Sequence, residues 1–237
     1  MKRLLDRLLR RTRRESPSRT ISPVHDVGFH GDRFLLELTH ALLAQSTAFV
    51  ETGTNVGSTA HYVATRHPHL MVYSGEPDEA AFRTAKETTA RDPNVVLYNM
   101  LSPEFLVQLH RDTPSLRSSL NFYWLDAHDY GFEWPLHDEI RYLTETLDRA
   151  IILVDDARVP TQPDRFKYCS YNGVDCDIAY VENALAPARE YQLFYPAYTE
   201  HTSAHHPLVG TLGILHGDLA LEEDVFAHFE RVGVNKP

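Results

Sequence analysis

Apolar residues recur at two alternating spacings over about residues 30–215, and these spacings predict alternating helices and strands. Residues 32–45 carry leucine and phenylalanine side chains at helical spacing, which predicts an amphipathic helix before the first strand. Short apolar runs then alternate with further helical segments. The predicted strands are residues 47–51, 70–74, 94–98, 120–125, 150–154, 191–195 and 209–215, and the predicted helices between them are residues 58–66, 77–87, 103–110, 135–147 and 177–184.

This alternation predicts the α/β fold class, with a doubly wound, mostly parallel seven-stranded sheet covered by helices on both faces. Residues 150–154 form the most apolar run and are expected at the centre of the sheet. No helix separates residues 191–195 from residues 209–215, so these two strands are expected to form an antiparallel hairpin at the sheet edge. We expect a single domain over residues 23–237.

Residues 1–22 read as a separate basic segment, a helix followed by a linker. Leucines at positions 4, 5, 8 and 9 recur at helical spacing among arginines, which predicts an amphipathic helix. The segment is too short and too charged to span a membrane. Two interpretations stay open: a solvated tail or helix packed on the domain, and a weak contact with an anionic membrane or a partner.

Composition and charge narrow the classes of function. The chain has 237 residues, of which 43% are hydrophobic and 24% charged, as in ordinary globular domains. Residues 21–237 contain 15 Lys and Arg against 31 Asp and Glu, a net charge of −16 that argues against a nucleic-acid partner. The spacing of Cys169 and Cys176 fits neither a disulfide framework nor a zinc site, so we expect reduced thiols in a cytoplasmic protein.

The first predicted strand runs into a glycine-containing turn. Glu51 ends the strand, Gly53 allows a sharp bend, Gly57 is expected to leave room for a ligand, and Ser58 can begin the next helix. Such a turn places unpaired amide groups beside a nucleotide-like molecule. A plain turn from strand to helix gives the same pattern.

Acidic residues follow the carboxyl ends of the other predicted strands, where open α/β sheets bind ligands. Glu76 follows the second strand, where a carboxylate can accept hydrogen bonds from both hydroxyls of a ribose. Asp126 ends the fourth strand, and Asp155 and Asp156 end the fifth. Three carboxylates that converge at one edge repel each other unless protons or a cation compensate their charge.

Four segments together resemble the motifs of class I S-adenosylmethionine-dependent methyltransferases over residues 30–215. They are Val-Glu-Thr-Gly-Thr-Asn-Val-Gly-Ser-Thr, Ser-Gly-Glu-Pro-Asp, Trp-Leu-Asp-Ala-His and Leu-Val-Asp-Asp. The resemblance implies a Rossmann-like methyltransferase fold and S-adenosylmethionine as cofactor. The residues that it assigns to the cofactor are Glu51, Gly53, Thr54, Asn55, Gly57, Ser58, Glu76, Met100, Ser102 and Asp126. Asn55 departs from the pattern, because the family often has its middle glycine there.

Within this family, the chain looks like the metal-dependent O-methyltransferases of the catechol and macrolide-sugar type. The resemblance implies that Asp126, Asp155 and Asp156 surround Mg²⁺, a cation that prefers oxygen ligands. Asp126 and His128 are the expected catalytic residues, with His128 as the base that removes the acceptor proton. The expected reaction methylates a hydroxyl of a small molecule such as a sugar or phenol.

Residues 157–176 form a long predicted loop that begins beside Asp155 and Asp156. Loops of this length are often lids, and we expect this one to close over the acceptor. Arg158 or Arg165 is expected to orient a polar or anionic acceptor, while Tyr168 and Tyr171 cover its apolar face. An ordered surface loop is the alternative.

Two other classes of function stay open. The formation of a homodimer is a separate open question. A nicotinamide-dependent oxidoreductase uses a similar sheet but needs a Gly-x-Gly-x-x-Gly turn, whereas this chain has Gly-x-x-x-Gly. A non-catalytic protein could keep the cofactor fold without turnover, and the departure at Asn55 favours that reading. The histidines at positions 201, 205 and 206 lack the spacing of a zinc site.

Overall fold

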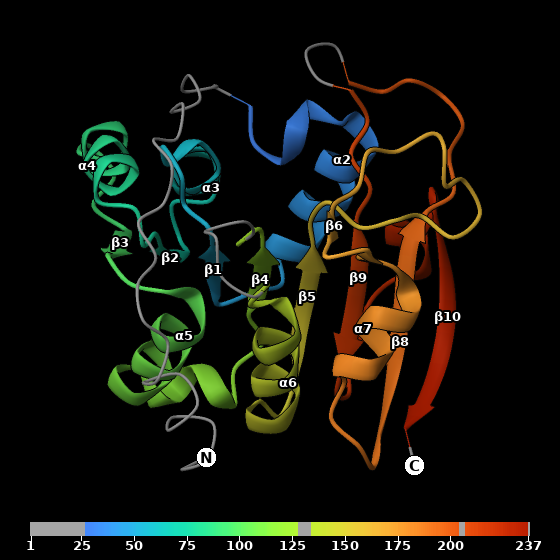
Figure 1. Ribbon diagram of the computed structural model, residues 1–237. Coiled ribbons are helices and arrows are strands. Elements are labelled where there is room, and N and C mark those ends of the chain that lie inside the picture. Colours follow the sequence, from blue (N-terminus) through green and yellow to red (C-terminus); the bar gives the residue numbers. More distant parts are fainter. Residues whose placement is uncertain (1–26, 128–133, 204–206, 237) are drawn as a thin grey trace.

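The computed structural model describes residues 27–127, 134–203 and 207–236, and an eight-stranded sheet runs through it (Figure 1). The strand order is β10-β8-β9-β5-β4-β1-β2-β3. Strands β1 to β5 are parallel, β9 is antiparallel to both β5 and β8, and β10 is antiparallel to β8. The strands are β1 (Ala48–Thr52), β2 (Met71–Gly75), β3 (Val95–Tyr98), β4 (Phe122–Leu125), β5 (Ala150–Val154), β8 (Arg189–Pro196), β9 (Leu212–His216) and β10 (Phe229–Lys236).

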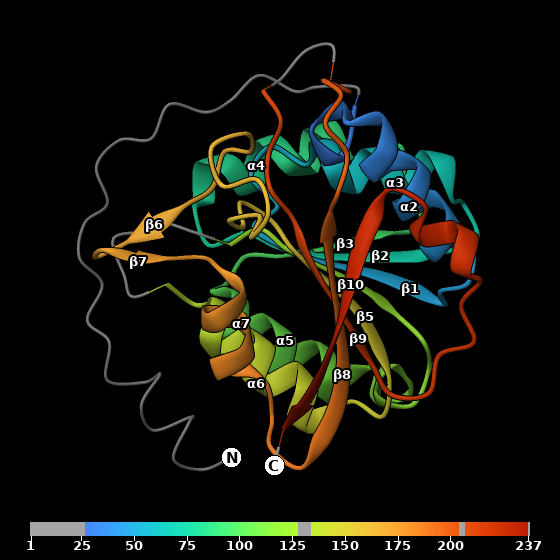
Figure 2. The ribbon, with the colours of Figure 1, turned by 90° about the vertical axis from the view of Figure 1, so that its right-hand side faces the viewer.

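Helices cover both faces of the sheet, which confirms the predicted doubly wound α/β fold. Figure 2 shows α2, α3 and α4 on one face and α5, α6 and α7 on the other. The helices are α2 (Arg33–Leu43), α3 (Ser58–Arg66), α4 (Glu79–Thr88), α5 (Ser102–Asp112), α6 (Leu136–Thr146) and α7 (Ile178–Ala184), with short 3₁₀ turns η1 (Phe29–Gly31), η2 (Pro114–Arg117) and η3 (Glu223–Phe226). None of the helices in the described ranges is long and apolar enough to cross a membrane.

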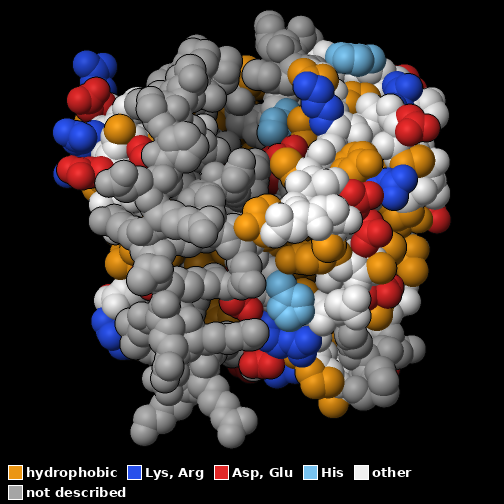
Figure 3. Space-filling model, in the orientation of Figure 1, with side chains coloured by type: hydrophobic (Ala, Val, Ile, Leu, Met, Phe, Trp, Pro, Cys, Tyr) orange, Lys and Arg blue, Asp and Glu red, His pale blue; other side chains and the backbone are white. Residues whose placement is uncertain are grey.

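The central strands form the core because helices shield them on both sides. All five residues of β5 are buried, as are all four of β4 and all five of β1. Residues 150–154 therefore lie at the centre of the sheet, as their apolar sequence predicts. On the face seen in Figure 3, the described acidic, basic and hydrophobic side chains are interspersed.

Strand β10 is the main element that the sequence analysis does not predict. It pairs with β8 along its whole length, from Phe229 opposite Pro196 to Lys236 opposite Arg189. The strands β8 and β9 are antiparallel, as expected, but β10 lies outside them and forms the sheet edge. An edge strand is only partly buried, so β10 can contain charged residues and a glycine. These residues interrupt the apolar pattern from which a strand is predicted.

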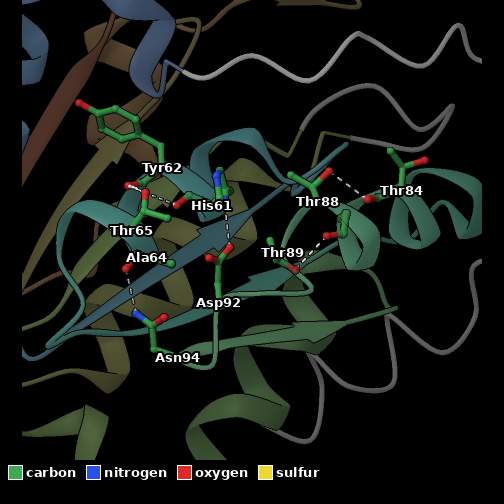
Figure 4. A network of polar contacts seen from close by, with 10 residues as sticks. His61, Tyr62, Ala64, Thr65, Thr84, Thr88, Thr89, Asp92 and Asn94 are labelled. Atoms are coloured by element: carbon green, nitrogen blue, oxygen red, sulfur yellow. Dashed lines mark hydrogen bonds and ion pairs between the residues drawn. The ribbon is translucent and has the colours of Figure 1, made fainter.

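Polar contacts tie α3 to the connection between α4 and β3 (Figure 4). The imidazole Nδ1 of His61 lies 2.6 Å from Oδ2 of Asp92, and the amide of Asn94 donates to the carbonyl oxygen of Ala64 at 3.3 Å. Asn94 also donates to the carbonyl oxygen of Leu70 at 2.8 Å. These contacts hold α3 against the amino ends of β2 and β3.

The buried carboxylate of Asp32 joins the start of α2 to a distant segment. It caps α2 by accepting from the backbone N–H groups of Phe34 and Leu35 at 3.0 and 3.3 Å. It also accepts from the hydroxyls of Tyr198 and Thr202, both at 2.7 Å. One side chain therefore fixes η1, α2 and the connection from β8 to β9 relative to each other.

We expect Asp32→Ala to lower the free energy of unfolding by about 2–4 kcal/mol, because it removes both a helix cap and the acceptor of two hydroxyls. Asp78→Ala is the matched control. Asp78 caps α4 through the N–H groups of Ala80 and Ala81 only, so its loss should cost about 1 kcal/mol. Urea unfolding measures both values. Equal losses would show that the hydroxyl contacts contribute nothing.

Candidate functional site

The carboxyl ends of the parallel strands all face one edge of the sheet, the upper edge in Figure 1. Glu51 lies in β1, Glu76 directly follows β2, Asp126 directly follows β4, and Asp155 and Asp156 directly follow β5. Neighbouring parallel strands bring these carboxylates together, as the sequence analysis predicts. Within the described residues, this edge also carries the one group of three or more potential metal ligands, namely Asp126, Asp155 and Asp156.

Gly53 begins a tight loop between β1 and α3. Its φ is +83°, and a Cβ atom there would lie 2.4 Å from the carbonyl oxygen of Asp126. The N–H groups of Gly53 and Thr54 both donate to the carbonyl oxygen of Gly75, at 3.0 and 3.1 Å. The loop is therefore held between the ends of β2 and β4, and only glycine fits at position 53.

Gly57 also has a φ of +83°, at the start of α3, and its missing side chain faces α4. A Cβ atom at Gly57 would lie 3.1 Å from Cα and 3.2 Å from Cβ of Ala85 in α4. Helix α4 therefore lies on the side where a Gly57 side chain would project, and contact of the Gly57 backbone with a ligand stays a prediction. The glycine allows close packing of α3 against α4.

Glu51 is buried and accepts a hydrogen bond from the hydroxyl of Ser74 at 2.5 Å. Burial raises the pKa of Glu51 well above its usual value; the hydrogen bond from Ser74 opposes this shift, while the charges of Asp126 and Glu76 add to it. Thr54 lies 2.5 Å from the same Ser74 hydroxyl, oxygen to oxygen. Burial and the neighbouring carboxylates therefore favour the neutral, protonated form of Glu51.

Glu76 holds the glycine-containing loop and the start of α4. One carboxylate oxygen accepts from the N–H of Asn55 at 2.7 Å, and the other accepts from the N–H of Asp78 at 2.9 Å. Asn55 has a φ of +50°, so its backbone adopts the left-handed conformation that presents this N–H. Contact of the Glu76 carboxylate with a ribose stays a prediction.

The residues expected near an adenine ring lie beside Glu76. The backbone N–H of Glu76 donates to the carbonyl oxygen of Tyr98 at 2.9 Å, and the amide of Asn99 donates to the carbonyl oxygen of Glu76 at 2.8 Å. Met100 follows Asn99, and Ser102 is the first residue of α5. The ends of β2 and β3 thus bring the expected ribose and adenine positions together. Ser58, another expected cofactor residue, begins α3.

Oxygen atoms of Asp126, Asp155 and Asp156 lie within 4.8 Å of one another. Asp156 has a φ of +52°, a left-handed conformation that is uncommon for aspartate. The thiol of Cys169 donates to Oδ2 of Asp156 at 3.2 Å, and the N–H of Cys169 donates to the Asp156 carbonyl oxygen at 2.8 Å. An all-oxygen set of this size fits Mg²⁺.

His30 is a site residue that the sequence analysis misses. Its Nε2 lies 2.9 Å from Oδ1 and 2.8 Å from Oδ2 of Asp155. Burial lowers the pKa of His30, but Asp155, with smaller contributions from Asp126 and Asp156, outweighs this effect and raises the pKa to about 9. The two residues are 125 positions apart, and no spacing in the sequence connects them.

The segment that contains the expected acceptor residues is partly a β-hairpin, β6 (Ser170–Tyr171) with β7 (Val174–Asp175). Asn172 and Gly173 both have positive φ, as in the two-residue turns that favour hairpins. Arg158 contacts Asp175 at 3.2 Å and lies over the ring of Tyr168 at 5.4 Å. Tyr171 lies in β6 itself.

These contacts place three of the expected acceptor residues on one folded segment, and their contact with an acceptor stays a prediction. The thiol of Cys169, which precedes β6, is free, and burial together with Asp156 raises its pKa to about 12. Cys176 is also free. His128, the expected base, lies outside the described residues.

No protein-family model and no curated protein sequence matches the chain. Among solved structures, the O-methyltransferase TomG from Streptomyces achromogenes, involved in tomaymycin synthesis and solved in complex with SAM, aligns with a TM-score of 0.54 at 17% identity, over 78% of this chain and 80% of its own. The O-methyltransferase from Bacillus cereus in complex with SAH aligns with a TM-score of 0.54 at 14% identity, over 82% and 84%.

Spermidine synthase from Thermotoga maritima aligns with a TM-score of 0.52 at 12% identity. The alignment covers 81% of this chain but 63% of the synthase, so this chain spans less than two thirds of that protein. At these identities the similarity concerns the fold. The chain has the Rossmann-like fold of class I S-adenosylmethionine-dependent methyltransferases, which confirms the predicted fold class.

We expect Gly53→Ala to destabilise the protein far more than Gly173→Ala. Both positions have φ near +80°, so each alanine costs about 1–2 kcal/mol for its backbone conformation. A Cβ at Gly173 meets nothing within 4 Å, whereas one at Gly53 meets the Asp126 carbonyl oxygen at 2.4 Å. The clash should add about 1–3 kcal/mol, measured by urea unfolding. Similar losses at both positions would argue against the close contact with Asp126.

Proposed function

We propose that the protein is an S-adenosylmethionine-dependent O-methyltransferase that methylates a hydroxyl of a small molecule with the help of a divalent cation. The observation that carries this proposal is the layout of the carboxyl edge. A glycine-containing loop and a ribose-type carboxylate lie at the ends of β1 and β2, and three clustered aspartates lie at the ends of β4 and β5. The ends of β1 and β2, the cofactor half, suit a nucleoside cofactor. The ends of β4 and β5, the cation half, suit a cation and lie on the same edge of the sheet.

The cofactor half supports the proposal through its preformed loop. Glu76 fixes the backbone of Asn55 and Asp78, so the loop does not need to order when a ligand binds. The carboxylate of Glu76 is the proposed acceptor for the ribose hydroxyls. The charges of Asp126 and Glu76, close to Glu51, would suit the positively charged methionine part of S-adenosylmethionine.

Asp126, Asp155 and Asp156 would hold the cation. A bound Mg²⁺ would supply positive charge that lowers the pKa of an acceptor hydroxyl and helps to orient it. The protein's own residues would position the acceptor, exclude water and fix the direction of attack, which are large contributions when two molecules must react in line. Arg158, Tyr168 and Tyr171, on the segment after β5, are the proposed acceptor contacts.

A sugar or phenol hydroxyl is the proposed acceptor class. The proposed contacts combine a cation with aromatic rings, and aromatic rings pack on the apolar faces of sugars and phenols. Neighbouring hydroxyls on such a molecule could also bind the aspartate-held cation. The similar O-methyltransferase structures agree with oxygen as the methyl acceptor, although the similar spermidine synthase fold carries another chemistry.

Calorimetry with the full chain tests the cofactor. S-adenosylmethionine should bind and NAD should not. Glu76→Gln should weaken binding by about 10- to 150-fold, which corresponds to the loss of a charge-assisted contact of about 1.5–3 kcal/mol. Asp78→Asn is the control for local loosening, because Asp78 also lies at the start of α4 but is not assigned to the ribose. Binding of NAD alone would favour the oxidoreductase, and unchanged affinity in Glu76→Gln would refute the ribose contact.

Formation of the demethylated cofactor, measured with a panel of catechols and monosaccharides, tests the metal. Excess chelator should abolish turnover, and Asp156→Asn should reduce it more than about 100-fold, since even residues outside the ligand set change metal sites by about 10- to 100-fold. Asp92→Asn, remote from the edge, should have no effect. Turnover that persists in chelator rules out the metal, and cofactor binding without turnover on any acceptor favours the non-catalytic alternative.

A further inference from the structure

His30 lies on the chelating side of Asp155. Its Nε2 is nearly equidistant from the two carboxylate oxygens, at 2.9 and 2.8 Å, so it lies close to the line that bisects the carboxylate group. A cation bound by both oxygens of one carboxylate occupies the same line. Because a carboxylate only accepts hydrogen bonds, Nε2 must carry a hydrogen in this arrangement. The imidazole thus fills the position that a bidentate cation would take.

The backbone of His30 is fixed by its neighbours. Its φ is +58°, and its carbonyl oxygen accepts a hydrogen bond from the hydroxyl of Ser203 at 3.0 Å. The adjacent ring of Phe29 is buried and packs edge-on against Trp124 with a centroid distance of 4.9 Å. The turn η1 therefore presents the imidazole to Asp155 and keeps its Cα in place.

The side chain of His30 is the solvent-accessible member of this pair. It is 28% exposed, whereas the Asp155 side chain is 1% exposed beneath it. Rotation about the side-chain bonds of His30 would carry the ring toward solvent and uncover both Asp155 oxygens. The buried ring of Phe29 anchors the backbone of the turn, whereas the imidazole of His30 is a separate, partly exposed side chain.

Both an imidazole N–H and a divalent cation place positive charge against Asp155, and two such groups at one carboxylate repel each other. We infer that His30 is a positioning residue that competes with the divalent cation for Asp155, so that the ring must turn outward before the cation binds. The inference rests on the proposed metal site and adds a residue and a conformational step to it. The site then has two exclusive states, one with the imidazole bound and one with the cation bound.

Titration calorimetry with Mg²⁺ and with Mn²⁺ alone, at fixed pH on the full chain, tests the competition. His30→Asn is the variant of choice, since asparagine tolerates the left-handed backbone of position 30 but is too short to copy the imidazole contact. If the imidazole-bound state holds about nine tenths of the population, removing it should tighten the apparent affinity about tenfold.

His61→Asn is the matched control. His61 also pairs with an aspartate, Asp92, with an Nδ1 to Oδ2 distance of 2.6 Å (Figure 4). The side chain of His61 is 34% exposed and that of Asp92 is 7% exposed. The substitution makes the same chemical change on another part of the surface. It should leave the affinity for both cations unchanged, which separates a local effect at Asp155 from a general change in protein charge.

Imidazole NMR of the wild-type protein gives a second readout that does not depend on a variant folding. The Nε2–H signal of His30 that reports the bond to Asp155 should disappear or shift as Mg²⁺ saturates the site, while the signals of His61 stay in place. Unchanged or weaker cation affinity in His30→Asn, or a His30 signal that is indifferent to saturating Mg²⁺, would overturn the inference while leaving the proposed O-methyltransferase standing. Absence of cation binding in every variant would overturn it as well, and S-adenosylmethionine binding on the same samples reports separately on the cofactor half.

Discussion

Electrostatic repulsion among carboxylates at one sheet edge is the constraint around which this part of the molecule is arranged. Two unit charges at 4.8 Å, the upper separation within the aspartate cluster, repel each other by about 3.5 kcal/mol at an effective dielectric constant of about 20. Parallel strands bring these carboxylates together. Different neighbouring groups, from side chains and from the backbone, stabilise each carboxylate. Ser74 donates to Glu51, backbone N–H groups bind Glu76, and the imidazole of His30 contacts Asp155.

These different contacts distinguish the cofactor half of the edge, at β1 and β2, from the cation half, at β4 and β5. Glu76 is bound by two backbone N–H groups, so its position follows from the fold of the loop and of α4. Within the described residues, the side-chain hydrogen bonds to the Asp155 carboxylate come from His30, whose side chain is partly exposed. The half that would bind the cofactor is thus preorganised, while the inferred rearrangement of the cation half needs only a rotation of the His30 side chain.

The sequence predicts those parts of the fold and the site that follow from local patterns. Apolar runs place β1 to β5, and the acidic residues at their ends meet because parallel strands end at one edge. The role of Gly57 could not be found in this way, since a close approach of Ala85 leaves no trace in the spacing around the glycine. His30 and β10 depend on contacts between segments far apart in the chain, and an edge strand with charged residues looks much like a loop.

The hydrogen bond between Tyr198 and Asp32 joins residues 166 positions apart, and this distance affects how the molecule forms during synthesis. At ~5–20 residues per second, a ribosome needs roughly 8–33 s between the two residues. Strands β1 to β4 and their glycine loop are translated within that interval, so their contacts can form on the ribosome. The turn that carries His30 must wait for the segment after β8. The hydrogen bonds that fix the His30 turn can therefore form only late in synthesis, after those of the glycine loop.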